Sequence, residues 1–193
     1  STPLYSSAAS DVYKRQGEVL EGDNEVEDTA FFIHSRIHIG APHAICVLHT
    51  HMPYATSITL LEDGKLEMIE QNALLFDGRI AYDDEYEGLA LASDEGDRLA
   101  RKIGNNSILF MASHGVVVAG PTVADAFNDL YYLERASMFQ VLAKSQGGNL
   151  RTISDRVRKE TQAQFADEAP KLADRHFTAL RRVLDNVEPS YRH

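Results

Sequence analysis

Two histidines, His49 and His51, follow an apolar run in the segment VLHTHMPYA, which covers residues 47–55. If a strand continues through them, both side chains point to the same face of a sheet, because strand side chains alternate. Each neutral imidazole carries one donor and one acceptor, and burying them without partners costs free energy. A bound cation would satisfy both acceptor nitrogens at once. The pair therefore indicates either a metal site or two hydrogen-bonded histidines on a loop.

A third histidine completes a candidate ligand set. His114 follows a second apolar run, SILFMAS, and precedes Gly115, where another backbone can approach closely. Sites in open α/β sheets gather at strand ends, and a catalytic zinc site has three protein ligands and one open position. We therefore take His114 as the third candidate ligand. His34 and His38 lie four residues apart, and we interpret them as a half-buried pair on a helix.

The elements that must position these side chains can be predicted from the spacing of apolar residues. Short apolar runs predict buried strands over residues 43–50 and 107–113. Amphipathic spacing, helped by Pro53 in a first turn and by caps at Ser93 and Thr122, predicts helices. These helices are expected over residues 28–40, 52–61, 93–103 and 123–144. Strands that alternate with helices indicate a layered α/β domain.

The two ends of the chain lack the alternation of strands and helices predicted for residues 28–144. Residues 1–16, STPLYSSAASDVYKRQ, have no helical or strand period and no apolar core of a signal peptide. They resemble translated sequencing-adapter read-through, so we expect a non-native or disordered leader. Residues 17–193 are expected to form one domain, in which two charged C-terminal helical segments are broken at Pro170.

The composition argues against several classes of function. The formal net charge is −10 and no basic stripe is present, whereas nucleic-acid binding needs clustered lysine and arginine. No apolar stretch approaches the roughly 20 residues of a membrane-spanning helix. The single cysteine, Cys46, excludes an internal disulfide framework and is typical of a reducing compartment. We therefore expect a cytoplasmic protein without nucleic-acid or membrane partners.

Two segments resemble the class II aldolase and adducin family, including its adducin-like bacterial members. They are HAICVLHTHMPYATS and, some sixty residues later, FMASHGVVVAGPTVADAFNDLYYLERASMFQ. The resemblance implies a three-layer α/β/α domain with a mostly antiparallel central sheet, and a member shortened at its N-terminus. It also implies a divalent metal held by His49, His51 and His114, zinc first, with manganese, cobalt or iron as alternatives. A homotetramer or other homo-oligomer is expected on the same ground.

The resemblance further implies a lyase that cleaves a C–C bond of a small hydroxy-carbonyl substrate, such as a sugar phosphate. The metal would stabilise an enediolate, and a side-chain base would move the proton. Family aldolases carry a metal-binding glutamate nineteen residues before the first histidine, but here that position is Ala30. Substitutes for this acid are expected among four residues: Glu27, Asp28, Tyr82 and Tyr86.

Two alternatives remain open at this point. A decarboxylase or dehydratase would use the same metal chemistry with a different proton donor. An adducin-like binding or assembly module would need no metal, and a scaffold would have no use for three converging imidazoles. We therefore expect an enzyme, and we interpret Glu134 in the helix over residues 123–144 as an ion-pairing or capping group.

Overall fold

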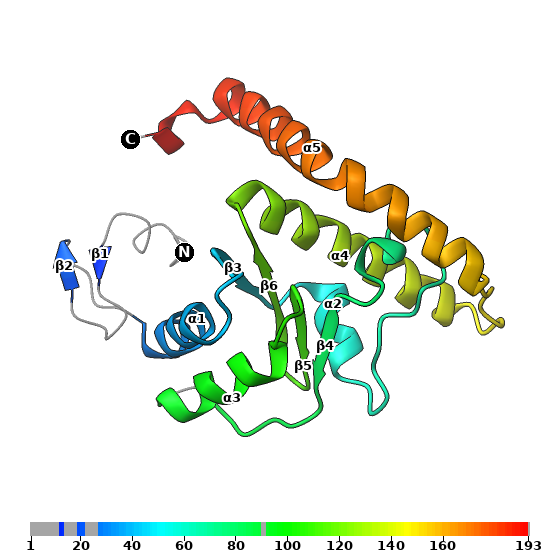
Figure 1. Cartoon of the computed structure of the whole chain (residues 1–193), viewed down its shortest axis with the longest axis horizontal. Coiled ribbons are helices and arrows are strands. Elements are labelled where there is room, and N and C mark those ends of the chain that lie inside the picture. The colour runs from blue at the N-terminus through cyan, green and yellow to red at the C-terminus, as the bar shows by residue number, and fades with distance from the viewer. Residues whose placement is uncertain (1–11, 14–18, 22–26, 90–91, 193) are drawn as a thin grey trace.

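A four-stranded mixed sheet forms the centre of the computed structural model, which describes residues 12–13, 19–21, 27–89 and 92–192 (Figure 1). The strand order is β3-β6-β5-β4. Strands β3 (Cys46–Thr50), β6 (Gly115–Gly120) and β5 (Ile108–Met111) pair antiparallel in turn, and β4 (Ile80–Asp83) pairs parallel to β5. A separate two-stranded sheet joins β1 (Val12–Tyr13) to β2 (Val19–Glu21). The mostly antiparallel central sheet is thus confirmed.

Helices cover both faces of this sheet, which confirms the three layers. Helices α1 (Asp28–Gly40) and α3 (Ser93–Ile103) pack against each other on one face. Helices α2 (Pro53–Thr59) and α4 (Val123–Ser145) cover the other face. Successive residues of β5 serve the two cores alternately, because Leu109 faces α1 and α3 while Phe110 lies in the opposite cluster. The 3-10 helix η1 (Ala73–Phe76) contacts α4.

The ends of α3 and α4 test the predicted caps. The Thr122 side chain accepts a hydrogen bond from the backbone N–H of Asp125, so the predicted cap of α4 is confirmed. The cap predicted at Ser93 is wrong, because Ala92 occupies the N-cap and Ser93 is the first helical residue. A serine there can still donate or accept locally, but it cannot accept from the N–H groups three residues ahead in the capping geometry.

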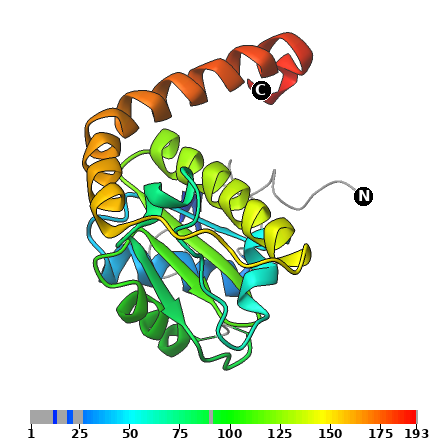
Figure 2. The same cartoon turned by 90° about the vertical axis from the view of Figure 1, so that its right-hand side faces the viewer.

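The C-terminal part forms one continuous helix, α5 (Asp155–Val187), followed by the 3-10 helix η2 (Pro189–Arg192). The predicted break at Pro170 is therefore wrong. Proline removes one backbone donor and bends a helix, but flanking turns can continue on both sides. Figure 2 shows that α5 changes direction partway along its length. This helix packs on α4 and η1.

None of the helices in the described part of the chain is long and apolar enough to cross a bilayer. The predicted leader, residues 1–16, lies outside the described residues except for β1, so that assignment stays a prediction.

A buried ion pair ties β4 to α4 at the end of the sheet where β4 begins. Asp129 is almost fully buried and accepts from Arg79, whose guanidinium also donates to Ser107 Oγ and to the Leu75 carbonyl. Burial raises the pKa of the Asp129 carboxyl, and the neighbouring Arg79 offsets only part of this effect. Folded protein therefore protonates Asp129 at a higher pH than unfolded protein does.

This raised pKa predicts a pH-dependent difference between wild type and Asp129→Asn. The contribution of the protonated carboxyl is fully present below the unfolded pKa and is lost as pH rises through the folded pKa. Wild type should thus gain stability relative to Asp129→Asn as pH falls from about 7 to about 4. Urea unfolding of both proteins at several pH values measures this difference. A difference that stays constant, or that moves the other way, would contradict the assigned direction.

Candidate metal centre

Strands β3 and β6 bring the first two histidines to one end of the sheet. His49 is the penultimate residue of β3 and pairs with Val117 of β6. The strand ends at Thr50, and His51 follows it directly, before α2 begins at Pro53. The apolar run thus forms the strand, and Pro53 starts the next helix directly after the two histidines. The predicted strand and helix around the His-x-His pair are confirmed.

A tight turn between β5 and β6 delivers His114 to the same end. Residues 112–114 connect the two strands, and Ser113 takes the left-handed backbone conformation with φ 54°. The Ser113 N–H donates to the Thr59 carbonyl at 3.0 Å, and the His114 N–H donates to the Met111 carbonyl at 3.2 Å. A left-handed serine is uncommon and is retained where the surroundings determine it. These bonds fix the position of His114.

The three imidazoles meet at short distances. The Nε2 atoms of His49 and His51 are 3.3 Å apart. The ring centroids lie 5.0 Å apart for His49 and His51, 4.9 Å for His49 and His114, and 4.8 Å for His51 and His114. One ring nitrogen from each histidine lies within 4.8 Å of the others. We call these three residues the histidine triad.

Hydrogen bonding orients the most buried ring of the triad. The Nδ1 atom of His49 lies 3.1 Å from the carbonyl oxygen of Val116. Because a carbonyl only accepts, Nδ1 carries the proton and donates it there. The lone pair is then on Nε2, which is the atom that approaches His51. This is the arrangement in which a histidine presents an acceptor nitrogen to a metal.

Burial keeps two imidazoles of the triad, those of His49 and His114, neutral. Burial lowers the pKa of His49 to about 4, with repulsion from His114 adding to the effect and the bond to Val116 opposing it. Burial also lowers the pKa of His114, which His51 lowers further and Glu95 raises. Imidazoles bind metal ions only when neutral. At neutral pH these two rings therefore have free lone pairs.

Gly115 permits the close approach of β6 to the triad, as its position after His114 led us to expect. A Cβ at this position would lie 2.6 Å from the Thr50 carbonyl oxygen and 2.6 Å from His51 Cδ2. The carbonyl belongs to the backbone that pairs with β6, so it cannot give way without loss of pairing. Only glycine fits here without displacement of His51.

We expect Gly115→Ala to lower the free energy of unfolding by about 1–3 kcal/mol, because the added methyl group overpacks the β3–β6 contact. It should also weaken metal binding, since His51 must shift. Urea unfolding and zinc titration measure the two effects. Gly148→Ala is the control, because nothing lies within 4 Å of the added Cβ at that position. Equal behaviour of the two variants would contradict the close-approach argument.

Glu134 of α4 supports the segment that follows His51. Its two carboxylate oxygens accept from the backbone N–H groups of Tyr54 and Ala55, at 3.0 and 2.9 Å. These are otherwise unpaired donors in the first turn of α2, which has no side-chain cap of its own. The predicted capping role of Glu134 is confirmed, and a charged acceptor at a helix N-terminus is favourable. The bond fixes the start of α2 directly after the triad.

Neither acidic residue suggested as a substitute for the family glutamate, Glu27 or Asp28, contacts the triad in the described structure. Glu27 caps α1: its carboxylate accepts from the Ala30 N–H at 2.6 Å and from the Thr29 hydroxyl. The Thr29 hydrogen bond is the largest cause of its lowered pKa. Asp28 is exposed in the first turn of α1. His34, one turn after Ala30, is close enough to His49 to contribute to its lowered pKa.

The two candidate tyrosines lie in different surroundings. The Tyr82 hydroxyl accepts from the Leu66 N–H at 3.1 Å, and its ring packs on Phe110 in the core. Burial raises the pKa of Tyr82. Tyr86 is 54% exposed, and its ring centroid is 6.3 Å from that of His114. Of the four residues suggested as acid or base, Tyr86 is therefore the one that the structure places in contact with the triad.

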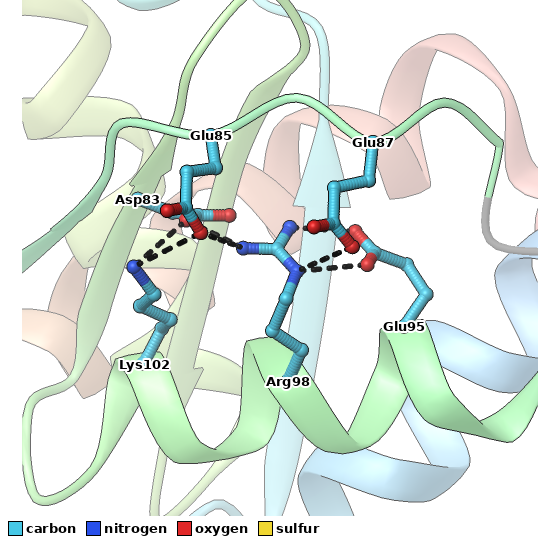
Figure 3. A network of polar contacts seen from close by, with 6 residues as sticks. All are labelled: Asp83, Glu85, Glu87, Glu95, Arg98 and Lys102. Atoms are coloured by element: carbon cyan, nitrogen blue, oxygen red, sulfur yellow. Dashed lines mark hydrogen bonds and ion pairs between the residues drawn. The ribbon is translucent and has the colours of Figure 1, made fainter.

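A charged network next to the triad was not anticipated. Arg98 of α3 binds carboxylates of α3, of β4 and of the segment that follows β4 (Figure 3). The network consists of Asp83, Glu85, Glu87, Glu95, Arg98 and Lys102. The i,i+3 pair Glu95 and Arg98 is visible in the sequence as a local signal. The contacts of Arg98 with residues 83–87 depend on tertiary structure.

The chain is similar in sequence to known proteins of one family. The model of the class II aldolase and adducin N-terminal domain matches residues 6–141. A "Putative aldolase class 2 protein" of Pseudomonas aeruginosa is 28% identical over 179 residues, which are 91% of this chain and 68% of that protein. Human beta-adducin is 31% identical over 189 residues, which cover 89% of this chain and 25% of beta-adducin.

A solved structure extends the similarity to the whole fold. The aldolase II superfamily protein from Pseudomonas syringae superposes with a TM-score of 0.83 at 30% identity, covering 94% of this chain and 73% of that one. The family model spans the segments that carry the histidine triad. With more than half of its length matched by the family model, the chain belongs to the class II aldolase and adducin family.

Proposed function

We propose that the chain is a divalent-metal-dependent lyase that cleaves a C–C bond of a small hydroxy-carbonyl compound, such as a sugar phosphate. The histidine triad is the observation that carries this proposal. Three imidazoles converge at one end of the sheet, and a scaffold gains nothing from this arrangement. We propose His49, His51 and His114 as the metal ligands, and zinc as the metal.

The donor set fits such an ion. Two Zn–N bonds of about 2.0–2.1 Å at a tetrahedral angle place the nitrogens roughly 3.3–3.4 Å apart. The Nε2 atoms of His49 and His51 are 3.3 Å apart. His49 also has the carbonyl partner on Nδ1 that metal-binding histidines commonly have. Three nitrogens suit several first-row ions and leave coordination positions for a substrate.

In this proposal the histidine triad binds the metal, and a different residue transfers the proton. A bound divalent ion supplies Lewis-acid polarisation of a substrate carbonyl. The bond from His49 to Val116 holds one ligand ring in a fixed tautomer and orientation. Tyr86 lies at the exposed side of His114 and can donate its hydroxyl hydrogen to a substrate oxygen. We propose Tyr86 as the proton-transfer group, since Ala30 provides no carboxylate.

Enzyme assays test the proposal directly. Protein freed of metal and reloaded with zinc, manganese or cobalt should release an aldehyde from a member of a panel of hydroxy-ketone phosphates. Tyr86→Phe should lower kcat by roughly 10²–10⁴-fold, the usual contribution of a positioned acid or base, while metal content is retained. Tyr82→Phe is the matched control, because that hydroxyl is bonded in the core. Full activity of Tyr86→Phe would remove Tyr86 from the mechanism.

Two other functions deserve assays of their own. Decarboxylation or dehydration uses the same ligands, and Ala30 at the glutamate position favours a reaction with a different proton donor. Carbon dioxide or water release from hydroxy acids would identify these reactions. The similarity to human beta-adducin supports a non-catalytic assembly module, which is the better account if the purified chain binds no metal. Sedimentation of the purified chain tests the expected homotetramer or other homo-oligomer.

A further inference from the structure

A segment of residues 84–89, which we call the Tyr86 segment, follows β4 and lies beside the triad. It has no helical or strand structure of its own. Segments of this kind are mobile unless side chains anchor them. The Tyr86 ring nevertheless contacts His114, at a centroid distance of 6.3 Å. The structure must therefore contain an anchor for this segment.

The anchor is the guanidinium of Arg98. Its Nη1 atom lies 2.6 Å from Asp83 Oδ1 and 3.8 Å from Glu85 Oε2, and its Nε atom lies 3.6 Å from Glu87 Oε2. Nε and Nη2 also donate to the two oxygens of Glu95 at 2.8 and 2.7 Å. One planar cation thus binds α3, the end of β4 and the Tyr86 segment together, which suits the fork geometry of arginine.

Burial makes part of this anchor rigid. Asp83 is 2% exposed, and its backbone carbonyl accepts from the Ala112 N–H at 2.8 Å in the turn that carries His114. The side chain of Arg98 is mostly covered as well. A buried, bidentate, multiply bonded arginine holds its geometry better than an exposed ion pair does. Lys102 adds a second cation, 3.4 Å from Asp83 Oδ1 and 3.7 Å from Glu85 Oε2, so it supports Arg98 in holding the segment.

The order of residues along the segment explains how the anchor directs Tyr86 toward His114. Glu85 and Glu87, two residues apart, both point toward Arg98 in Figure 3. Tyr86 lies between them and contacts His114 instead. Successive side chains of this segment thus contact the charged network and His114 in turn. Two carboxylates held on one side therefore direct the intervening tyrosine to the other side, toward the triad.

We infer that Arg98 is a positioning residue of the proposed active site: through Glu85 and Glu87 it holds the Tyr86 segment so that Tyr86 lies against His114. This inference rests on the proposed metal-dependent function. The hydroxyl of Tyr86 has no hydrogen-bond partner among the described residues, so it is available to a substrate oxygen. Arg98 itself contacts neither the triad nor a substrate in this role.

The test removes the two outer carboxylates and leaves the buried Arg98–Asp83 pair intact. Glu85→Gln/Glu87→Gln should raise amide hydrogen exchange of residues 84–89 by about tenfold, because the segment loses its anchor. Asp84→Asn is the matched control: it lies in the same segment and loses a carboxylate, but it has no ion pair in the described part of the chain. Equal exchange in the two proteins would overturn the inference.

A second measurement reports where residue 86 lies. The chain has no tryptophan, so Tyr86→Trp introduces a single tryptophan, whose emission can be excited apart from that of the tyrosines. Co²⁺ bound at the triad should quench its emission, because the ring of residue 86 lies beside His114. Adding Glu85→Gln/Glu87→Gln should weaken the quenching without changing the Co²⁺ stoichiometry, and adding Asp84→Asn should not. Unchanged quenching in the Gln variant would also overturn the inference.

The two measurements separate this inference from the proposed function. If Co²⁺ binds to none of the proteins, the metal-dependent function is contradicted. Hydrogen exchange then still decides whether the ion pairs of Glu85 and Glu87 hold the segment. If Co²⁺ binds and the anchor fails, the metal site stands and Tyr86 is held by something else. A further comparison, KM against kcat for Glu85→Gln/Glu87→Gln, should show a loss mainly in kcat, as expected for a displaced proton donor.

Discussion

Replacing His49 and His51 together by alanine is expected to abolish divalent metal binding. The wild-type protein should purify with about one ion per chain, or bind about one after incubation with zinc at neutral pH. Loss of a residue that only orients a ligand lowers affinity by about 10–100-fold, so loss of two ligands should exceed that range. Metal analysis by mass spectrometry, beside isothermal titration with zinc, measures both quantities.

The control for this experiment is another histidine near the same strand. His43 is exposed and bonds the Asn106 carbonyl through Nε2 at 3.0 Å, before the start of β3, whereas the triad lies at the end of that strand. His43→Ala should keep its metal. Far-UV circular dichroism should show that the double variant remains folded, since His51 is exposed. Equal metal content in the double variant and wild type would contradict the proposed ligands.

Replacing Arg98 by methionine is expected to lower the free energy of unfolding by about 3–5 kcal/mol. Removing one partner of a buried ion pair leaves the other charge buried without compensation. Asp83 is 2% exposed and keeps only Lys102 as a cationic partner in this variant. The Oδ2 atom of Asp83 lacks a hydrogen-bond partner among the described residues, so it cannot compensate for the lost bond between Oδ1 and Arg98. Urea unfolding of the metal-free proteins measures the loss.

Arg101→Met is the matched control, because it removes the same side chain from the same helix. Arg101 is exposed and has no ion pair in the described part of α3, so its loss should change stability by less than about 0.5 kcal/mol. A loss in Arg98→Met no greater than that in Arg101→Met would contradict the buried network. Asp83→Asn should be destabilising as well, since it leaves Arg98 with exposed partners and one half-buried carboxylate.

Local patterns were sufficient for much of the fold. The apolar runs predicted β3 and β5, and Thr122 predicted the start of α4. Side-chain capping and burial periodicity act over a few residues, and are therefore present in the sequence. The exception among the helices is α5, which continues through Pro170 because packing and flanking turns outweigh one lost hydrogen bond.

The histidine triad shows which features of a site a local sequence pattern can predict. The His-x-His spacing identified two candidates by local geometry alone, and His114 was added from its place at a strand end. Their convergence depends on the antiparallel pairing of β3 with β6, which places His49 opposite Val117. Local spacing contains no information about that pairing. Ligation by the three histidines itself stays a prediction.

What the sequence by itself determined is the identity of the donors and the elements that carry them: three imidazoles, two apolar runs and a glycine. Only the tertiary structure decided which of two tyrosines, Tyr82 or Tyr86, faces the triad. It also decided that Arg98 binds the carboxylates beside Tyr86. The physical reason is that these choices depend on burial and on contacts between segments distant in the chain, which no periodicity records.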